Sequence, residues 1–338
     1  MDAIAYLLNF YRIPMETKML KKITLAISLM LAAVGPAIAQ AYPNKPVKLV
    51  VPFPPGGGTD IMGRLIAQKL SEAWQQTVIV DNKPGANTQI GTEFVAKAPS
   101  DGYTLLMASP SHTINPSLYK NLKFDTQKEF SGAAIVAIGP LVLAVNPSVP
   151  AKNVRELIEL AKAQPGKISY ASAGTGSSTH LAGELFENLS SVDMLHVPYK
   201  GTAPAITDLI GGQVLATFSP LPGVLQHIRN GKLKALALTG TKRFAGMPEL
   251  PTIAESGLSG YEVQQWWGIV VPSGTPKEVV KKINADVTKI LESQSVRDQL
   301  AAIGAEPGNG SPEQFDSLIR NEIMQWGKLI ESAKIVAD

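Results

Sequence analysis

Three consecutive glycines between an apolar run and an amphipathic segment constrain the fold of this chain more than any other feature. Leu49-Val50-Val51 precedes Gly56-Gly57-Gly58, and after the glycines apolar side chains recur every three or four residues as far as Trp74. A short apolar run is typical of a buried strand, and the later spacing is typical of a helix packed on a sheet. The pattern predicts a strand, a glycine loop and a helix, with Thr59 or Asp60 as N-cap.

This glycine loop is a candidate anion site. Residues without a Cβ let backbone N–H groups turn toward one point, and a helix N-terminus favours a negative charge by about 0.3–1 kcal/mol. A tight turn without a ligand is the alternative. The loop is not a nucleotide-binding P-loop, because no Lys-Ser/Thr pair follows the last glycine. Asp60 would bring a negative charge to the site, which favours a capping role over ligand contact.

The same pattern of strand, small-residue loop and helix recurs later in the chain. Ile168–Ala171 is predicted as a strand, 172–179 is a loop of small and hydroxyl residues, and a helix starts at about His180. A third strand, Tyr103–Ala108, ends at the loop Ser109–Thr113. Strands that alternate with helices predict an α/β fold with mainly parallel sheets, in which ligands bind at the carboxyl ends of strands.

Two ligand loops in separate parts of the chain suggest two lobes with a ligand between them. The long apolar segment Ala133–Val145 is a candidate crossing between the lobes, and Trp266–Pro272 is a candidate return strand. We therefore expect a discontinuous first lobe of residues 40–141 plus 266–338 and a second lobe of residues 142–265.

The N-terminal segment has the pattern of an export signal. Lys18, Lys21 and Lys22 precede an apolar run over 23–34, and Ala37-Ile38-Ala39 is a small-residue cleavage pattern. The run is shorter than the roughly 20 residues that span a bilayer. We interpret residues 1–39 as a cleaved signal region, with 1–18 upstream of a true start at Met19, and predict an exported protein.

Composition excludes several classes of function. Without the first 39 residues the chain has 299 residues and a formal charge of +1, so nothing in the charge favours nucleic acid or membrane binding. Cysteine is absent, which excludes disulfides and thiolate chemistry. The four histidines are scattered without metal-ligand spacing, so we predict no metal and no cofactor.

Ordered motifs along the whole mature chain resemble one known family. They are Tyr42-Pro43 with Lys45-Pro46, the stretch from Val51 to Asp60, Asn82 to Ala86, Asp101 to Leu106, Asn115 to Tyr119, Gly174 to Leu181, Val197 to Gly201, Leu250-Pro251-Thr252, and Trp266 to Pro276. This chain resembles the Bordetella uptake gene (Bug) proteins, the periplasmic solute receptors of tripartite tricarboxylate transporters.

The resemblance implies a two-lobed periplasmic binding protein of the Venus flytrap type that closes on a small carboxylate. It also implies a monomer that delivers its ligand to a large and a small membrane subunit, with no catalytic activity. The ligand-binding positions carried onto this chain are Pro55, Gly56, Gly57, Thr59, Asp60, Ser109, His112, Thr175, Ser177, Ser178 and Thr179, with Phe53, Tyr199 and Ser219 as wall residues.

One segment departs from the family pattern. Asn87-Thr88-Gln89 follows Pro84-Gly85-Ala86, where the family usually has a glycine pair. Larger polar side chains there change the reach or the contacts of this loop. Ligand preference is therefore expected to be unusual.

Other functions stay open at the level of sequence. An exported hydrolase could use Ser177 or Ser178 with His180, although the glycine of a nucleophile elbow is missing. A ligand sensor for a membrane signalling protein is another alternative. Tricarboxylates, C4-dicarboxylates, acidic amino acids and aromatic acids all fit amide and hydroxyl donors, and Lys200 could pair with a distal carboxylate or be solvated.

Overall fold

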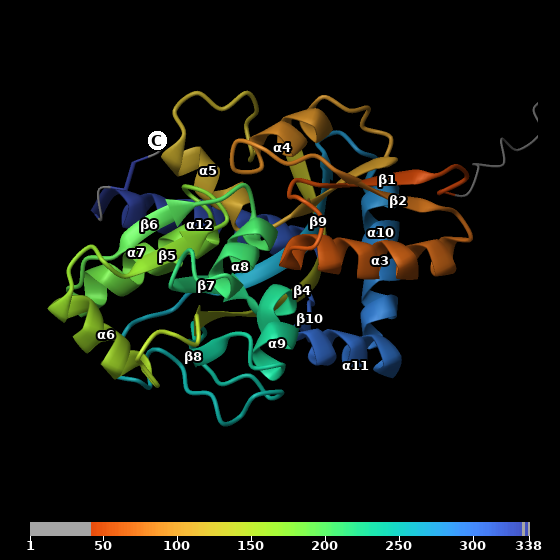
Figure 1. The fold of residues 1–338 in the computed structure, drawn as a ribbon. Coiled ribbons are helices and arrows are strands. Elements are labelled where there is room, and N and C mark those ends of the chain that lie inside the picture. The colour runs from red at the N-terminus through yellow and green to blue at the C-terminus, as the bar shows by residue number, and fades with distance from the viewer. Residues whose placement is uncertain (1–41, 333–334, 337–338) are drawn as a thin grey trace, which may run out of the picture. The chain divides into compact units, whose positions relative to one another are not determined.

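The computed structural model describes residues 42–332 and 335–336. The predicted signal region, residues 1–39, lies outside the described residues. The secondary-structure elements belong to the unit that begins at Lys45. Figure 1 shows how they are arranged.

Strands and helices alternate along much of this unit. The strands are β1 (Val47–Val51), β2 (Val78–Asn82), β3 (Thr104–Ala108), β4 (Phe130–Val145), β5 (Ser169–Ser172), β6 (Leu195–Pro198), β7 (Ala216–Pro220), β8 (Lys234–Leu238), β9 (Gln264–Pro272) and β10 (Glu306–Pro307). The helices are α3 (Gly58–Trp74), α4 (Gln89–Ala96), α5 (Ser111–Leu118), α6 (Val154–Ala163), α7 (Ser178–Ser190), α8 (Thr202–Ile210), α9 (Leu221–Arg229), α10 (Lys277–Glu292), α11 (Gln294–Ile303) and α12 (Pro312–Ser332).

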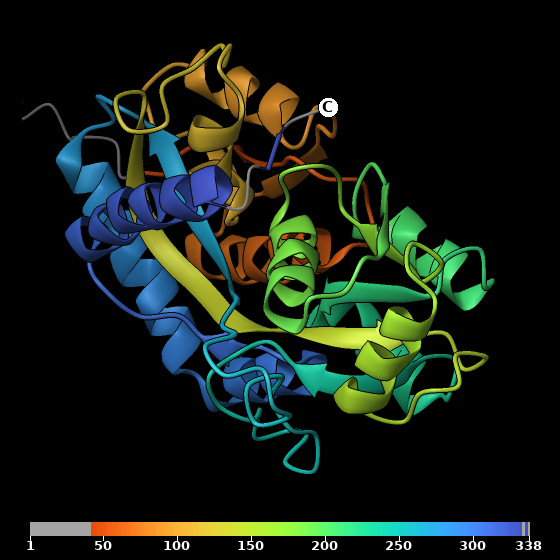
Figure 2. The same cartoon turned by 90° about the vertical axis from the view of Figure 1, so that its left-hand side faces the viewer.

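The strands pair in the order β2-β1-β3-β9-β4-β7-β5-β6, and β8 and β10 pair with β4. The long strand β4 pairs with β9 from Phe130 to Pro140 and with β7 from Leu141 to Val145. Figure 2 shows β4 continuing from one part of the sheet into the other. We call β1, β2, β3, β9 and β10 the first half of the sheet, and β5, β6, β7 and β8 the second half.

Strand direction brings the predicted ligand loops to one place. β1 is parallel to β2 and β3, and β9 is antiparallel to both β3 and β4, so β1, β2, β3 and β4 run in the same direction. In the second half, β7 is antiparallel to β4, and β5 is parallel to both β6 and β7. The carboxyl ends of β1 to β3 therefore point toward the second half, and those of β5 to β7 point back toward the first.

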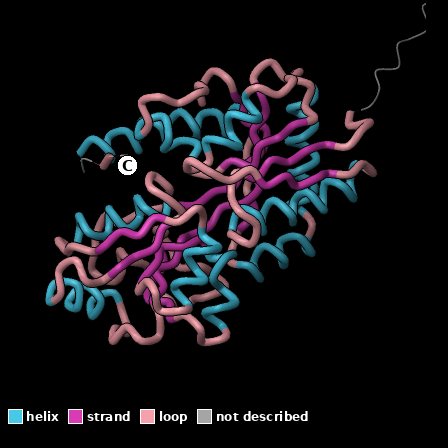
Figure 3. The backbone as a smooth tube through the Cα atoms, turned by 45° about the horizontal axis from the view of Figure 1, so that its top comes forward, coloured by secondary structure: helices cyan, strands magenta, loops and turns pink. Residues whose placement is uncertain are grey.

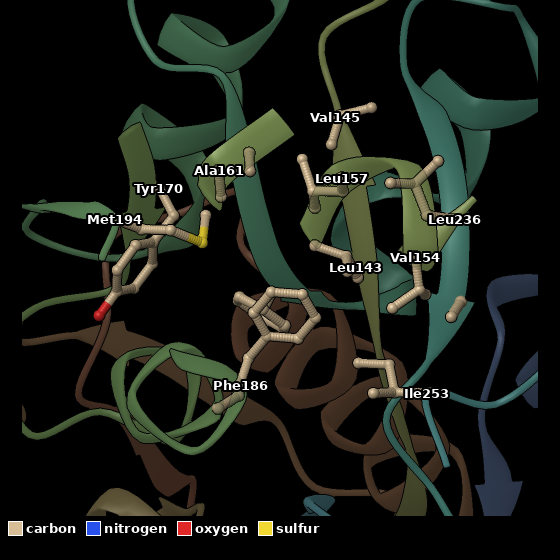
Figure 4. Close-up of a cluster of buried hydrophobic side chains, with 14 of the residues drawn as sticks. Leu143, Val145, Val154, Leu157, Ala161, Tyr170, Phe186, Met194, Leu236 and Ile253 are labelled. Atoms are coloured by element: carbon tan, nitrogen blue, oxygen red, sulfur yellow. The ribbon is translucent and has the colours of Figure 1, made fainter. Parts of the chain in front are cut away.

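Helices cover the strands, as Figure 3 shows. In the first half, α3 buries Met62, Ile66 and Leu70, in agreement with the three-to-four spacing of its apolar residues. In the second half, Leu143 of β4, Leu157 of α6 and Phe186 of α7 meet in one buried cluster (Figure 4). Full burial of side chains of this kind stabilises the fold by about 1.5–3 kcal/mol each.

Two local predictions differ from the structure. Helix α3 begins at Gly58 with Gly57 as N-cap, so neither Thr59 nor Asp60 occupies the N-cap position. Residues 109–113 are not all loop, because helix α5 starts at Ser111. The sequence did not predict α5 because it contains Pro116, and proline lacks an N–H and usually breaks a helix.

Candidate ligand-binding site

The glycine loop is held in place by the carboxylate of Asp60. Oδ2 of Asp60 accepts hydrogen bonds from the Gly56 N–H (2.9 Å) and Arg64 Nε (2.9 Å), and Oδ1 accepts one from Asn82 Nδ2 (2.8 Å). Burial alone would raise the pKa of Asp60, but the hydrogen bonds from Arg64, Gly56 and Asn82 outweigh it, and the pKa is lowered. Asp60 is therefore ionised and fixes the loop. Gly56 has φ +87°, a conformation that glycine adopts without strain.

Residues at five helix N-termini line one small cavity. Its volume is about 20 Å³, which is room for roughly one water-sized group. The lining includes Gly57 and Thr59 around the start of α3, Ser109 and Ser111 around the start of α5, Ser177, Ser178 and Thr179 around the start of α7, Thr202 at the start of α8, and Pro220, the N-cap of α9. The first amides of a helix have no partner within it and carry its positive dipole end. Phe53, Pro54, Ala173 and Gln265 are the other lining residues, and among the described residues of this lining none carries a charge.

Hydroxyl groups at this cavity form a connected set. Ser177 Oγ and Thr179 Oγ1 lie 2.8 Å apart, and Ala173 N–H donates to Thr179 Oγ1 (2.7 Å). Ser178 Oγ donates to Gln265 Oε1 at 2.9 Å. These contacts orient hydroxyl groups at the N-terminus of α7 before any ligand arrives.

A second cavity of about 110 Å³ shares Phe53, Pro54 and Ala173 with the first. Its walls come from 84–88 and Tyr119 on the side of the first half and from 173–175, Tyr199 and Lys200 on the side of the second half. Lys200 is the charged residue among all those that line the two cavities. The pair of cavities thus combines uncharged donors at one end with a cation at the other.

A hydrogen bond links the two sides of the site, because Tyr119 Oη donates to the carbonyl of Thr175 (2.9 Å). Within the first half, Trp267 Nε1 of β9 donates to Thr59 Oγ1 of α3 (3.2 Å). Helices α3, α8 and α9, whose N-termini reach the small cavity, lie side by side in Figure 1.

The structure brings most of the predicted ligand residues together. Gly57, Thr59, Ser109, Ser177, Ser178 and Thr179 line the small cavity, and Thr175 and Tyr199 line the larger one. The predicted positions that line neither cavity are Pro55, Gly56, Asp60, His112 and Ser219. Asp60 instead accepts a hydrogen bond from the Gly56 N–H just before α3, which is closer to the capping role predicted for it than to ligand contact.

His112 is packed in the interior. Its side chain is buried and meets the edge of Phe130 with ring centroids 5.0 Å apart. Burial lowers the pKa of His112 to about 4, so the ring is neutral at pH 7. This places the side chain in a structural environment away from the cavity lining.

Three polar residues that line the small cavity escaped the sequence analysis as ligand contacts. Ser111 lies in the first turn of the undetected helix α5, and Gln265 precedes the two tryptophans of β9. Thr202 had a recognisable signal, because it follows Gly201 and opens α8 in the manner of the first glycine loop.

The side chains proposed for a hydrolase are not arranged for that chemistry. The His180 ring has its Nδ1 accepting from the Gly176 N–H (3.1 Å) and its Nε2 at 3.2 Å from Glu184 Oε1. Neither Ser177 nor Ser178 has a hydrogen bond to that ring among the described residues. Within the same residues, no three His, Cys, Asp or Glu side chains gather as a metal site.

Loops and helix N-termini from both halves of the sheet meet at two cavities, an arrangement that defines a two-lobed solute-binding protein of the periplasmic, Venus flytrap class. A family model described as "Tripartite tricarboxylate transporter family receptor" matches residues 62–335. Protein BugT of Bordetella pertussis is 36% identical over 309 residues, which cover 90% of this chain and 95% of BugT.

Solved structures agree with that match. Rpa4515 of R. palustris, determined with adipate, is 38% identical with a TM-score of 0.86 and covers 88% of this chain and 100% of its own. MatC of Rhodopseudomonas palustris, determined with malate, is 31% identical with a TM-score of 0.81, over 86% of this chain and 100% of MatC. The chain belongs to the tripartite tricarboxylate transporter receptor family, which confirms the predicted family and fold class.

The family model describes its members as receptors of tripartite tricarboxylate transporters. Across residues 42–332, no helix has both the length and the apolar character needed to cross a membrane.

Proposed function

We propose that this protein is an extracytoplasmic receptor that binds a small carboxylate between two lobes. The lobes are residues 40–141 plus 266–338 and residues 142–265, and the chain acts as a monomer in the periplasm after removal of residues 1–39. It hands its ligand to the large and small membrane subunits of a tripartite transporter and has no catalytic activity.

The observation that carries this proposal is the convergence of five helix N-termini on a cavity that is lined, in the part of the chain that the structure describes, by uncharged residues. Each N-terminus favours an anion by about 0.3–1 kcal/mol, more when partly buried. A carboxylate oxygen accepts several N–H and O–H bonds, which matches the helix N-termini and the hydroxyls of this lining. Adipate and malate in the related structures support the same class of ligand.

Binding between two lobes also supplies a mechanism of closure. Donors from α3 and α5 stand on one side of the small cavity, and donors from α7 and α8 stand on the other. Only the closed arrangement lets one carboxylate use both sets. The ligand therefore shifts the equilibrium toward closure through its higher affinity for the closed state.

A thermal-shift screen tests the proposal. Residues 40–338 are unfolded and refolded to remove carried-over ligand, and are then mixed with mono-, di- and tricarboxylates, acidic amino acids and aromatic acids. An acid at 100 times its dissociation constant is expected to add about 2.7 kcal/mol of stability, which raises the melting temperature visibly. Absence of any shift in well-folded protein would contradict a carboxylate receptor.

A further inference from the structure

The loop 84–88, at the wall of the larger cavity, has an unusual backbone. Ala86 (φ +45°), Asn87 (φ +44°) and Thr88 (φ +73°) all lie in the left-handed region. Side chains with a Cβ disfavour that region, β-branched ones most strongly, whereas glycine adopts it freely. Contacts of these side chains must therefore compensate for the strained backbone.

Asn115 of α5 supplies those contacts. Its Nδ2 donates to the carbonyl of Asn87 (2.8 Å) and to Thr88 Oγ1 (3.2 Å). Its Oδ1 accepts from Asn87 Nδ2 at 2.8 Å. Because Asn115 Nδ2 is committed as the donor, its Oδ1 must be the acceptor, which fixes the orientation of the Asn87 amide.

The same orientation leaves Asn87 Oδ1 buried without a hydrogen-bond donor among the described residues. A buried acceptor without a donor is unfavourable, so a polar partner is needed. Among the described residues, buried polar side-chain atoms without a hydrogen-bond partner occur in Asn87, His112, Thr126, Ser219 and Trp326. Of these five residues, only Asn87 lines one of the two cavities.

Asn87 also faces the second half of the sheet. A Cβ built on Gly176 would lie 3.2 Å from Asn87 Nδ2, so the loop before α7 packs closely against this amide. The neighbouring Thr175 lines the larger cavity with Asn87. The Asn87 side chain therefore stands where both sides of the site meet, at the wall of the larger cavity.

The charge of the larger cavity favours one kind of donor. Hydroxyl and ammonium groups can both donate to an amide oxygen. Lys200 lines this cavity, and a ligand ammonium would be repelled by that cation. A neutral hydroxyl meets no such repulsion. A second carboxylate on the ligand would be attracted to Lys200.

We propose that the ligand is a hydroxycarboxylate whose hydroxyl donates to Asn87 Oδ1 while its carboxylate occupies the small cavity at the helix N-termini. This inference rests on the proposed carboxylate receptor and adds the residue that selects the ligand. It gives the departure at residues 87–89 from the family pattern a specific role in ligand choice.

The test is calorimetric titration of refolded residues 40–338 with pairs of acids that differ by one hydroxyl: malate with succinate, citrate with tricarballylate, and lactate with propionate. We expect the hydroxylated member of at least one pair to bind about tenfold more tightly, which is about 1.4 kcal/mol. Asn87→Gly should reduce that preference below twofold while the acid without the hydroxyl keeps its affinity. Glycine adopts φ +44° without strain, so the variant should fold.

Gln75→Gly is the matched control, because it removes another side chain from a residue of positive φ (+51°) at the end of α3 and outside both cavities. It should keep the full preference. Equal binding of both members of every pair by the wild-type protein, or a preference that survives Asn87→Gly, would overturn the role of Asn87 and leave the carboxylate receptor standing. Failure of every acid to bind would overturn both proposals.

Discussion

A close approach between the two sides of the site predicts the effect of one added methyl group. Gly57 has φ −81° and ψ 168°, so alanine fits its backbone. A Cβ at Gly57 would lie only 2.6 Å from Thr202 Oγ1, closer than such atoms approach, while the Cβ of Thr202 would lie at an ordinary 3.9 Å. Gly57→Ala should therefore obstruct the closed site through one hydroxyl group.

The expected magnitude follows from that contact. Overpacking costs about 1–3 kcal/mol, and Thr202 can relieve part of the overlap by rotating its side chain. We therefore expect a loss of about 1.4 kcal/mol in binding free energy, which is a tenfold larger dissociation constant. Alanine is also a poorer N-cap than glycine, which lowers stability independently of the ligand. Gly57→Ala combined with Thr202→Ala keeps this capping cost and removes the overlap.

Isothermal titration calorimetry with the tightest-binding acid of the screen measures the effect. Thr202→Ala alone shows how much affinity the loss of the Thr202 hydroxyl costs. Relative to that variant, the double variant should lose much less affinity than Gly57→Ala loses relative to the wild type. Gly211→Ala is the control, because Gly211 also has a negative φ (−73°) and the nearest atom to an added Cβ is 3.5 Å away. Wild-type affinity in Gly57→Ala, or no recovery in the double variant, would refute the reasoning.

Three further substitutions probe charge, closure and stability. Lys200→Met should weaken the binding of dicarboxylates by up to about fivefold at low salt and that of monocarboxylates less, because an exposed ion pair contributes about 0.2–1 kcal/mol. Calorimetry measures both affinities, with Lys232→Met as the control. Equal losses for both acid classes would contradict it. Tyr119→Phe removes the bond to the Thr175 carbonyl, and ligand dissociation followed by stopped-flow fluorescence should become faster; an unchanged rate would argue against a closing contact. Because the pKa of His112 is about 4 in the folded protein, the free energy of unfolding should fall by up to about 3 kcal/mol as the pH drops from 6.5 toward 4. Urea unfolding of His112→Leu should lack this part of the loss. Equal acid sensitivity of the variant and the wild type would contradict the buried neutral ring.

Local patterns in the sequence carried much of the fold. The apolar run at 49–51 and the spacing after Gly58 predicted β1 and α3, because burial on one face of a helix imposes its own period. The loops that follow β1, β3 and β5 were recognised because small and hydroxyl residues replace apolar ones at each strand end. Parallel pairing brings the ends of β1 and β3 to one edge, and β5, which runs in the opposite direction in the second half, brings its end to face them.

Other features depend on tertiary contacts that a single sequence does not display. Asp60 was ambiguous until its bonds to Gly56, Arg64 and Asn82 fixed its direction. Thr202 faces Gly57 only because β4 passes through both halves of the sheet. The positive φ angles of Ala86, Asn87 and Thr88 are held by Asn115, which lies nearly thirty residues away.

The position of a bound carboxylate tests the central claim most directly. A crystal structure of residues 40–338 with the tightest-binding acid should place one carboxylate in the small cavity, within hydrogen-bond distance of the α3 amides near Thr59 and the α7 amides near Ser178, with donors from both halves of the sheet. A carboxylate bound elsewhere, or held by one half alone, would contradict a receptor that closes around its ligand.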